Sequence, residues 1–407
     1  MTTRVSKKIW VYLGVGLLWF LALLWPLLGI KPEGLEFGKT FTVWIRVALA
    51  AFIIAVFYQL QQKGVFDFVG RSAGTLKERV TTGFEAMPNW IWMTALLAFA
   101  LVFPMLTGRY GHDIAINVLV YICLGLGLNI VVGLAGLLDL GYIAFYGVGA
   151  YTYALLSVHF GIPFWLCLPV AAALAAVAGC IIGYPTLRMR GDYLAIVTLG
   201  FGEIVRLLLN NWMELTNGPN GILGIERPGY YWFDFSNGFS IQHFWIRDLS
   251  LYYYVILGIT LFTIVAVYRL NYSRIGRAWE AIREDETAAE LMGVNTFLLK
   301  LLAYASGATF AGFAGAFFAS RMRFVSPESF TFLESAMVLA MVVLGGMGSI
   351  PGVILGCIAL VALPEAFREF ELYRMLVFGG VMTGMMLVRP KGLWPAKRMG
   401  KRSDDSD

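Results

Sequence analysis

The side chains that most often carry out enzymatic chemistry are few and scattered in this 407-residue sequence. Its three histidines, His112, His159 and His243, stand singly, without cysteine or carboxylate partners at the spacing of a metal site. The four cysteines all fall inside apolar runs, where free thiols pack as small hydrophobic side chains. They are Cys123, Cys167, Cys180 and Cys357. The pattern predicts no metal and no nucleophile, so we interpret the chain as not an enzyme.

One segment, "GLEFGKT" at residues 34–40, resembles a phosphate-binding loop. Its Gly38, Lys39 and Thr40 fit the end of the G-x4-G-K-[ST] pattern, but the preceding glycine is one residue too close. The segment also lies between two apolar runs and follows no predicted strand, which such a loop requires. We therefore expect no nucleotide and no other cofactor to be bound by this chain.

The charged stretch "RIGRAWEAIREDETAAELMGVN", residues 274–295, has 8 charged residues among 22. With a helical period, its apolar residues fall on one face. These are Ile275, Ala278, Trp279 and Ile282, continued by Ala289 and Met292. The pattern predicts a short amphipathic helix beside the membrane. Two interpretations remain open: a solvated loop helix, or a helix that binds in a groove of a cytoplasmic partner.

Acidic residues also occur in or beside the apolar runs, where an unpaired carboxylate is costly. Asp139 either caps a turn between adjoining spans or lies near the ammonium group of a substrate. Glu203 and Arg206 stand three residues apart, a spacing that predicts a structural ion pair on one helix face. Glu334 begins its apolar run and is interpreted as interfacial.

Glycines are dense in two runs, 133–141 and 345–352, and both are rich enough to break a helix. Close helix packing is one explanation for such residues. Broken helices also line substrate sites in transporters. The candidate pathway or hinge residues are Asp139, Gly141, Gly345, Gly346, Gly348 and Gly352. The segment "GGMGSIPG" at 345–352 is our preferred gate or hinge.

The elements that must position these residues are membrane spans. The chain is 59% hydrophobic and only 14% charged, with a mean hydropathy of +0.72, whereas soluble proteins have about 25% charged residues. We therefore predict an all-α polytopic bundle with 10–12 transmembrane helices. The apolar runs lie at 9–29, 40–60, 90–107, 114–134, 138–158, 163–183, 193–210, 250–269, 301–320, 333–350, 352–364 and 371–389. Those at 138–158 and 352–364 are candidates for broken or re-entrant segments.

The distribution of Lys and Arg predicts the orientation, because cytoplasmic loops are enriched in both residues. With both termini inside, the cytoplasmic segments hold 20 of the 31 basic residues, and the stretch 274–295 is cytoplasmic. The first apolar run is too long for a signal peptide and is interpreted as a retained span. The outside segment 211–249 is rich in aromatic residues, which indicates an interfacial belt or a cap over the pathway.

Three regions follow from these patterns. We expect residues 1–89 to form an appendage of two spans and a cytoplasmic linker, residues 90–395 to form a membrane core with a cytoplasmic loop at 270–300, and residues 396–407 to form a polar cytoplasmic tail.

Several motifs together resemble a known family. "TAAELMG", from Thr287 to Gly293, is similar to the "EAA…G" signature with which permeases of ABC importers contact their ATPase subunits. Thr287 replaces the signature's Glu, and the later "I-LP" is missing. The segments "GLNIVVGLAGLLDLGYIAFYGVGAYTYALL" (127–156), "PTLRMRGDYLAIVTLGFGEIVR" (185–206) and "RPKGLWP" (389–395) resemble the LivM family of branched-chain amino-acid ABC permeases.

The resemblance covers residues 90 to 395 and implies a subunit that imports leucine, isoleucine and valine by alternating access. The implied partners are a second, LivH-like permease subunit, two LivG/LivF-like cytoplasmic ATPase subunits that use ATP and Mg²⁺, and a periplasmic substrate-binding protein. The implied location is the bacterial inner membrane. The residues expected to contact an ATPase subunit are Glu280, Ala281, Glu286, Thr287, Ala288, Ala289 and Gly293.

A permease for urea or short amides is an alternative within the same class. A multi-span enzyme would need clustered polar catalysts within the membrane, and the sequence has only isolated carboxylates there. A passive channel would explain the spans and glycines but not a helix suited to binding an ATPase.

Overall fold

The computed structural model describes residues 30–31, 34–35, 98, 100–189, 191–234, 240–246, 248–366, 379–380 and 392–395. The chain divides into two compact units, Met1–Ala98 and Phe99–Asp407. In the first unit, β1 (Ile30–Lys31) pairs with β2 (Gly34–Leu35) as a short antiparallel ladder. The predicted spans at 9–29 and 40–60, the rest of "GLEFGKT", most of 371–389 and the tail 396–407 lie outside the described residues.

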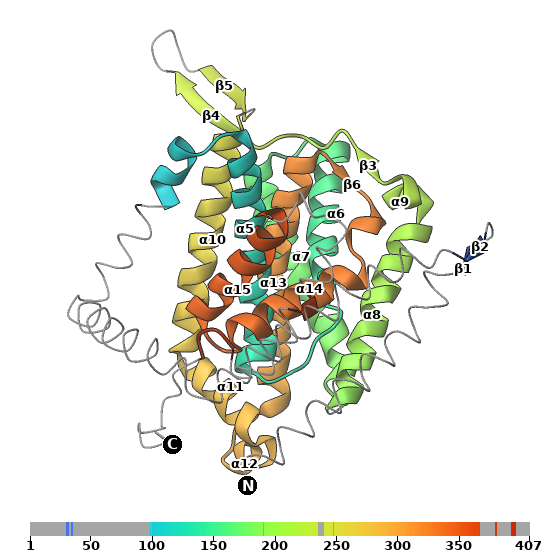
Figure 1. Cartoon of the computed structure of the whole chain (residues 1–407), viewed down its shortest axis with the longest axis vertical. Helices are drawn as coiled ribbons and strands as arrows, with labels where there is room; N and C mark the ends of the chain where they lie inside the picture. Colours follow the sequence, from blue (N-terminus) through green and yellow to red (C-terminus); the bar gives the residue numbers. More distant parts are fainter. Residues whose placement is uncertain are drawn as a thin grey trace. The chain divides into compact units, whose positions relative to one another are not determined.

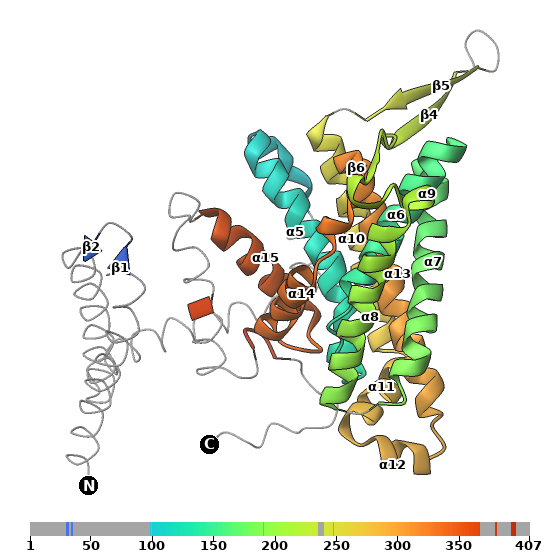
Figure 2. The same ribbon diagram turned by 90° about the vertical axis from the view of Figure 1, so that its right-hand side faces the viewer.

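Within the residues that the structure describes, seven helices are long and apolar enough to cross a membrane. A shorter helix, α15 (Ile350–Ala366), follows the last of them. The prediction of a polytopic helical bundle is confirmed (Figures 1 and 2). The spanning helices are α5 (Arg109–Leu128) continued by η1 (Asn129–Leu134), α6 (Ile143–Phe160), α7 (Phe164–Thr186), α8 (Asp192–Asn211), α10 (Leu249–Asn271), α13 (Thr296–Met322) and η3–α14 (Pro327–Ser329 and Phe332–Gly345).

The helix α13 is the centre of the bundle and packs against α5, α6 and α7. Glycines allow these helices to approach closely. A Cβ on Gly149 of α6 would lie 2.6 Å from the Cα of Gly312 on α13, and one on Gly179 of α7 would lie 2.8 Å from the Cβ of Ala308. These glycines therefore allow close helix packing. In a membrane, helices associate mainly through such van der Waals contact.

The first predicted break is present between α5 and α6. Residues 129–134 form a π-helix, η1, and residues 135–142 are not helical. The Tyr142 hydroxyl donates to the Gly307 carbonyl (2.9 Å), near the middle of α13, so this irregular segment reaches the interior of the bundle. Its residues alternate between buried and more exposed. Non-helical backbone is tolerated at this depth because protein covers it.

The second predicted break separates α14 from α15. Gly346 has φ +120° and Gly348 has φ +87°, conformations that residues with a side chain rarely adopt. The segment 392–395 packs against this turn, where the Trp394 N–H donates to the Gly345 carbonyl (3.0 Å). The predicted single span at 333–350 therefore ends at residue 345.

The charged stretch 274–295 forms two helices instead of the predicted one, α11 (Arg274–Glu284) and α12 (Glu286–Leu291). Asp285 separates them in an extended conformation, and its side chain caps α12 by accepting a hydrogen bond from the Ala288 N–H (3.0 Å). Both helices lie at one end of the second unit (Figures 1 and 2).

The aromatic segment after α8 lies at the opposite end (Figure 1). It contains α9 (Met213–Thr216), η2 (Gly218–Asn220) and three strands, which take part in two antiparallel pairs, one of them with a strand that follows α13. The pairs are β3 (Ile222–Leu223) with β6 (Phe324–Val325), and β4 (Gly229–Asp234) with β5 (Ser240–Trp245).

Candidate coupling surface and polar contacts of the bundle

The packing of α11 and α12 fixes which of their residues face outward. Trp279 is fully buried and donates its indole N–H to the Leu299 carbonyl (2.7 Å). Ile282 and Ala289 are 5% exposed, as the predicted apolar face requires. The assignment of Met292 to that face is wrong, because its side chain is 84% exposed. The chain turns at the end of α12, so the helical period does not continue to this residue.

The residues expected to contact an ATPase subunit separate into two groups. Four of them are exposed, and three contribute to packing or are half-buried. The exposed four are Ala281, Thr287, Ala288 and Gly293. The others are Glu280, which is half-buried, Ala289, which is buried, and Glu286, which is paired with Lys300.

Sequence reasoning missed two residues of this outward surface. Leu291 is 83% exposed and lies beside the equally exposed Met292. Both follow Ala288 at helical spacing, so the signal was present in the sequence. Large apolar side chains exposed on a charged loop indicate a surface that a partner covers.

An ion pair fixes α12 to the second turn of α13. The Lys300 Nζ lies 2.5 Å from the Glu286 Oε1, and the Lys300 side chain is only 7% exposed. A buried ammonium is stable only with such a partner. Glu286 therefore helps to fix the position of α12 against α13.

The helix α11 directly contacts the first break of the bundle. The Arg283 guanidinium donates to the Gly133 carbonyl of η1. The Arg283 side chain also packs against Gly136, where an added Cβ would lie 2.7 Å from its Cγ. Gly136 has φ +74°, so a glycine fits this turn for both steric and conformational reasons.

The two breaks are joined to each other by Asn129, which is fully buried. Its Oδ1 accepts a hydrogen bond from the Gly348 N–H (2.7 Å). There is no space for a side chain at Gly133, since an added Cβ would lie 2.0 Å from the Asn129 Oδ1. Arg283, Gly133, Asn129 and Gly348 thus connect α11 with both breaks.

Asp139 lies in the irregular segment and is 1% exposed. Its Oδ1 accepts a hydrogen bond from the Gly141 N–H (2.9 Å), which is the turn-capping arrangement. The next residue, Leu140, donates its N–H to the Thr198 Oγ1 of α8 (3.1 Å). An added Cβ on Gly141 would lie 2.1 Å from the Thr198 carbonyl oxygen, so this segment and α8 are in close contact.

The remaining predicted glycines lie at the second break. Gly345 and Gly352 face each other across the turn, because a Cβ on Gly345 would lie 2.3 Å from the Gly352 carbonyl oxygen. The residues assigned to a hinge therefore pack tightly around one turn.

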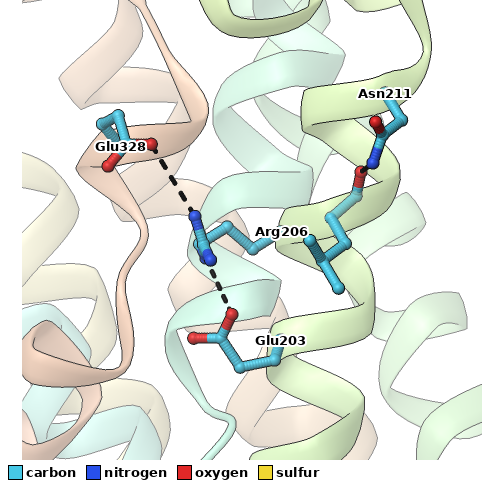
Figure 3. Close-up of polar contacts among 5 residues, drawn as sticks. Glu203, Arg206, Asn211 and Glu328 are labelled. Carbon is cyan, nitrogen blue, oxygen red and sulfur yellow. Dashed lines mark hydrogen bonds and ion pairs between the residues drawn. The ribbon is translucent and has the colours of Figure 1, made fainter.

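The predicted pair on α8 is present (Figure 3). The Arg206 Nε donates to the Glu203 Oε2 (2.8 Å), and a second carboxylate, the Glu328 Oε1 of η3, lies 3.7 Å from the Arg206 Nη1. The structural ion pair is confirmed, and the tertiary structure extends it to a neighbouring element. Glu334 accepts a hydrogen bond from the Tyr121 hydroxyl of α5 (2.8 Å).

The sequence was compared with known proteins. Residues 110–388 match the family model described as "Branched-chain amino acid transport system / permease component". The chain is 50% identical over 320 residues to the high-affinity branched-chain amino acid transport system permease protein LivM of Escherichia coli, covering 76% of this chain and 75% of that protein. The Salmonella typhimurium LivM is 50% identical over 367 residues, covering 87% and 86%.

A more distant relative is the permease protein LivH of Escherichia coli, at 26% identity over 288 residues, covering 67% of this chain and 90% of that protein. No solved structure matches the chain.

Proposed function

Because the chain belongs to the family of branched-chain amino acid transport system permease components, we propose that it forms one half of the membrane path of an ATP-driven importer for leucine, isoleucine and valine. It is a multi-pass membrane protein and a transport subunit. In this proposal it lies in a bacterial inner membrane with both termini in the cytoplasm. The cytoplasmic position of α11 and α12 then follows from the basic residues around them.

The observation that carries the proposal is the connection from α11 to both helix breaks. Arg283 contacts Gly133, and Asn129, one turn earlier in the same element, holds Gly348 (2.7 Å). A displacement of α11 therefore acts on η1 and on the turn between α14 and α15 at once. Such an arrangement is suited to a permease that alternates between outward and inward access.

The proposed partners follow from the names of the relatives and from the outward surface of α12. LivM and LivH are both named permease proteins of a branched-chain amino acid transport system, so we propose a LivH-like second permease subunit. ATP and Mg²⁺ would be used by two cytoplasmic ATPase subunits, one of which covers Ala288, Leu291 and Met292. A periplasmic binding protein would deliver the amino acid at the opposite end.

Uptake in cells tests the cargo. The chain is deleted and restored, and uptake of radiolabelled leucine, valine and urea is measured in parallel. We expect leucine and valine uptake to be lost on deletion and recovered on restoration, with urea uptake unchanged. Loss of urea uptake alone would instead favour the amide permease, and unchanged uptake of all three would refute an import role.

A further inference from the structure

Three polar residues at a spacing of four on α5, namely Asp113, Asn117 and Tyr121, contact charged side chains of α13 and α14. Asp113 and Asn117 both bind Arg321 of α13, and the Asn117 Oδ1 accepts from the Arg321 Nη1 (2.7 Å). Tyr121 donates to the Glu334 Oε2 of α14 (2.8 Å). Residues at i and i+4 lie on one helix face, about 6 Å apart along the axis. Through these side chains, α5 contacts the ion pair of Arg321 with Asp113 at one level and the Glu334 carboxylate about one turn further along.

Charges in this part of a membrane protein require an explanation, because they are costly away from water. The Arg321 side chain is only 9% exposed. Glu334 is half-buried in the first turn of α14 and, within the described part of the chain, has a tyrosine but no basic residue as its partner. A carboxylate in this position favours a positively charged ligand.

Aromatic rings adjoin both charges. The ring centroid of Tyr146 on α6 lies 5.4 Å from that of Phe318 and 5.4 Å from that of Phe330. Phe318 precedes Arg321 by one turn of α13, and Phe330 precedes Glu334 by four residues. An apolar surface and two opposite charges therefore meet between α5, α6, α13 and α14.

One polar atom at the edge of this cluster lacks a partner. The ring of Tyr151 lies 6.1 Å from that of Phe330, and the residue is 3% exposed. Among the described residues, nothing forms a hydrogen bond with its hydroxyl. Buried hydroxyls are almost always hydrogen-bonded in native proteins, so this one indicates a ligand or water that completes the arrangement.

We propose that Arg321, Glu334 and the rings of Tyr146, Phe318 and Phe330 form a binding site for a zwitterionic α-amino acid on its way through the membrane. Arg321 binds the carboxylate, Glu334 binds the ammonium group, and the rings contact the aliphatic side chain. This inference rests on the proposed import function and adds a site within this chain.

The ligand sets the separation that the two charged groups of the protein need. Each charged group lies roughly 3 Å from the ligand atom that it binds, and the ammonium and carboxylate of an α-amino acid share one carbon. The two protein charges must then lie roughly 6–8 Å apart, similar to one helical turn. A ligand with one charge can pair with only one of Arg321 and Glu334, and neutral urea can form an ion pair with neither.

Direct binding tests the site. The whole membrane complex is purified with its copurifying subunits and without the soluble binding protein, and equilibrium binding of radiolabelled leucine is measured. We expect competition by valine, and at least about tenfold weaker competition by 4-methylpentanoate, 3-methylbutylamine and urea, which lack one or both charges. Glu334→Gln and Arg321→Gln should each weaken leucine binding by about tenfold or more.

Matched controls are Glu214→Gln and Arg269→Gln, at exposed residues outside the proposed site. These should bind leucine as the wild type does. Glu334→Asp and Arg321→Lys, which keep the charges, should retain more binding than the neutral variants, which separates a lost charge from a misfolded complex.

Wild-type affinity in both neutral variants, equal competition by 4-methylpentanoate, or no leucine binding by the wild-type complex would overturn the site. These outcomes are distinguishable from failure of the import function. If the import function is wrong, cells without the chain will take up leucine and valine normally. If only the site is wrong, uptake of leucine and valine will still depend on the chain.

Discussion

The Asn129 Oδ1 accepts a hydrogen bond from the Gly348 N–H (2.7 Å), although 219 residues separate them in the chain. Asn129 begins the π-helix η1, and Gly348 lies in the turn between α14 and α15. Single-turn π segments inside α-helices are frequent at functional sites. This bond joins the two irregular parts of the bundle directly.

Replacement of the asparagine should disturb both breaks. In Asn129→Ala the buried Gly348 N–H loses its acceptor, which costs about 1–3 kcal/mol. We expect a lower melting temperature of the purified complex and reduced leucine uptake at equal protein level. The control is Asn211→Ala, at an exposed asparagine that bonds only its own helix. Wild-type behaviour of Asn129→Ala would contradict the role of this bond.

The space around Gly133 supplies a steric test. An added Cβ would lie 2.0 Å from the Asn129 Oδ1 and 2.5 Å from the Gly348 backbone N, so Gly133→Ala should displace the turn at Gly348 and strongly reduce uptake. Gly258→Ala is the matched control, because no atom beyond its own stretch of helix backbone lies within 4 Å of the position that its Cβ would occupy. It should retain uptake. Normal transport by Gly133→Ala would show that the contact between the breaks is dispensable.

The outward surface of α12 should decide whether an ATPase subunit remains bound. Ala288→Glu places a bulky charge on this surface without disturbing the packing of α12, since Ala288 is exposed. We expect the variant to reach the membrane in normal amounts and to copurify with less ATPase subunit. Glu290→Gln, an exposed change on the same helix, is the control. If the purified Ala288→Glu variant carries as much copurifying ATPase activity as the wild type, the docking assignment is refuted.

The ion pair between Glu286 and Lys300 should hold α12 in place. Glu286→Gln leaves the Lys300 ammonium, 7% exposed, without its carboxylate, at a cost of about 1–3 kcal/mol. We expect faster proteolysis of the loop 274–295 in membrane vesicles. A double variant, Glu286→Gln with Lys300→Met, should recover protection because it leaves no unpaired buried charge. Equal cleavage of all forms would show that the pair does not stabilise the loop.

The sequence was sufficient for the properties that depend on local pattern. Apolar runs long enough to cross the membrane predicted α5 to α8, α10, α13 and α14, because a span must satisfy its own backbone hydrogen bonds. The spacing of Glu203 and Arg206 predicted their ion pair, and the glycine runs predicted both breaks. The family followed from motifs, and the comparisons confirmed it.

The errors have a local cause as well. The stretch 274–295 was predicted as one helix, but Asp285 accepts a hydrogen bond from the Ala288 N–H and so ends one helix and begins another. A side chain that competes for backbone hydrogen bonds is only a weak signal in sequence. Met292 was consequently assigned to the buried face although it is exposed.

The sequence by itself determined that this chain spans the membrane, which of its described segments do so, and to which family it belongs, since these properties are encoded in neighbouring residues. Only the tertiary structure decided that Arg283 contacts Gly133, that Asn129 holds Gly348, and that Arg321 and Glu334 face one side of α5. The physical reason is the packing of helices distant in sequence, which brings polar groups together at positions that no local periodicity specifies.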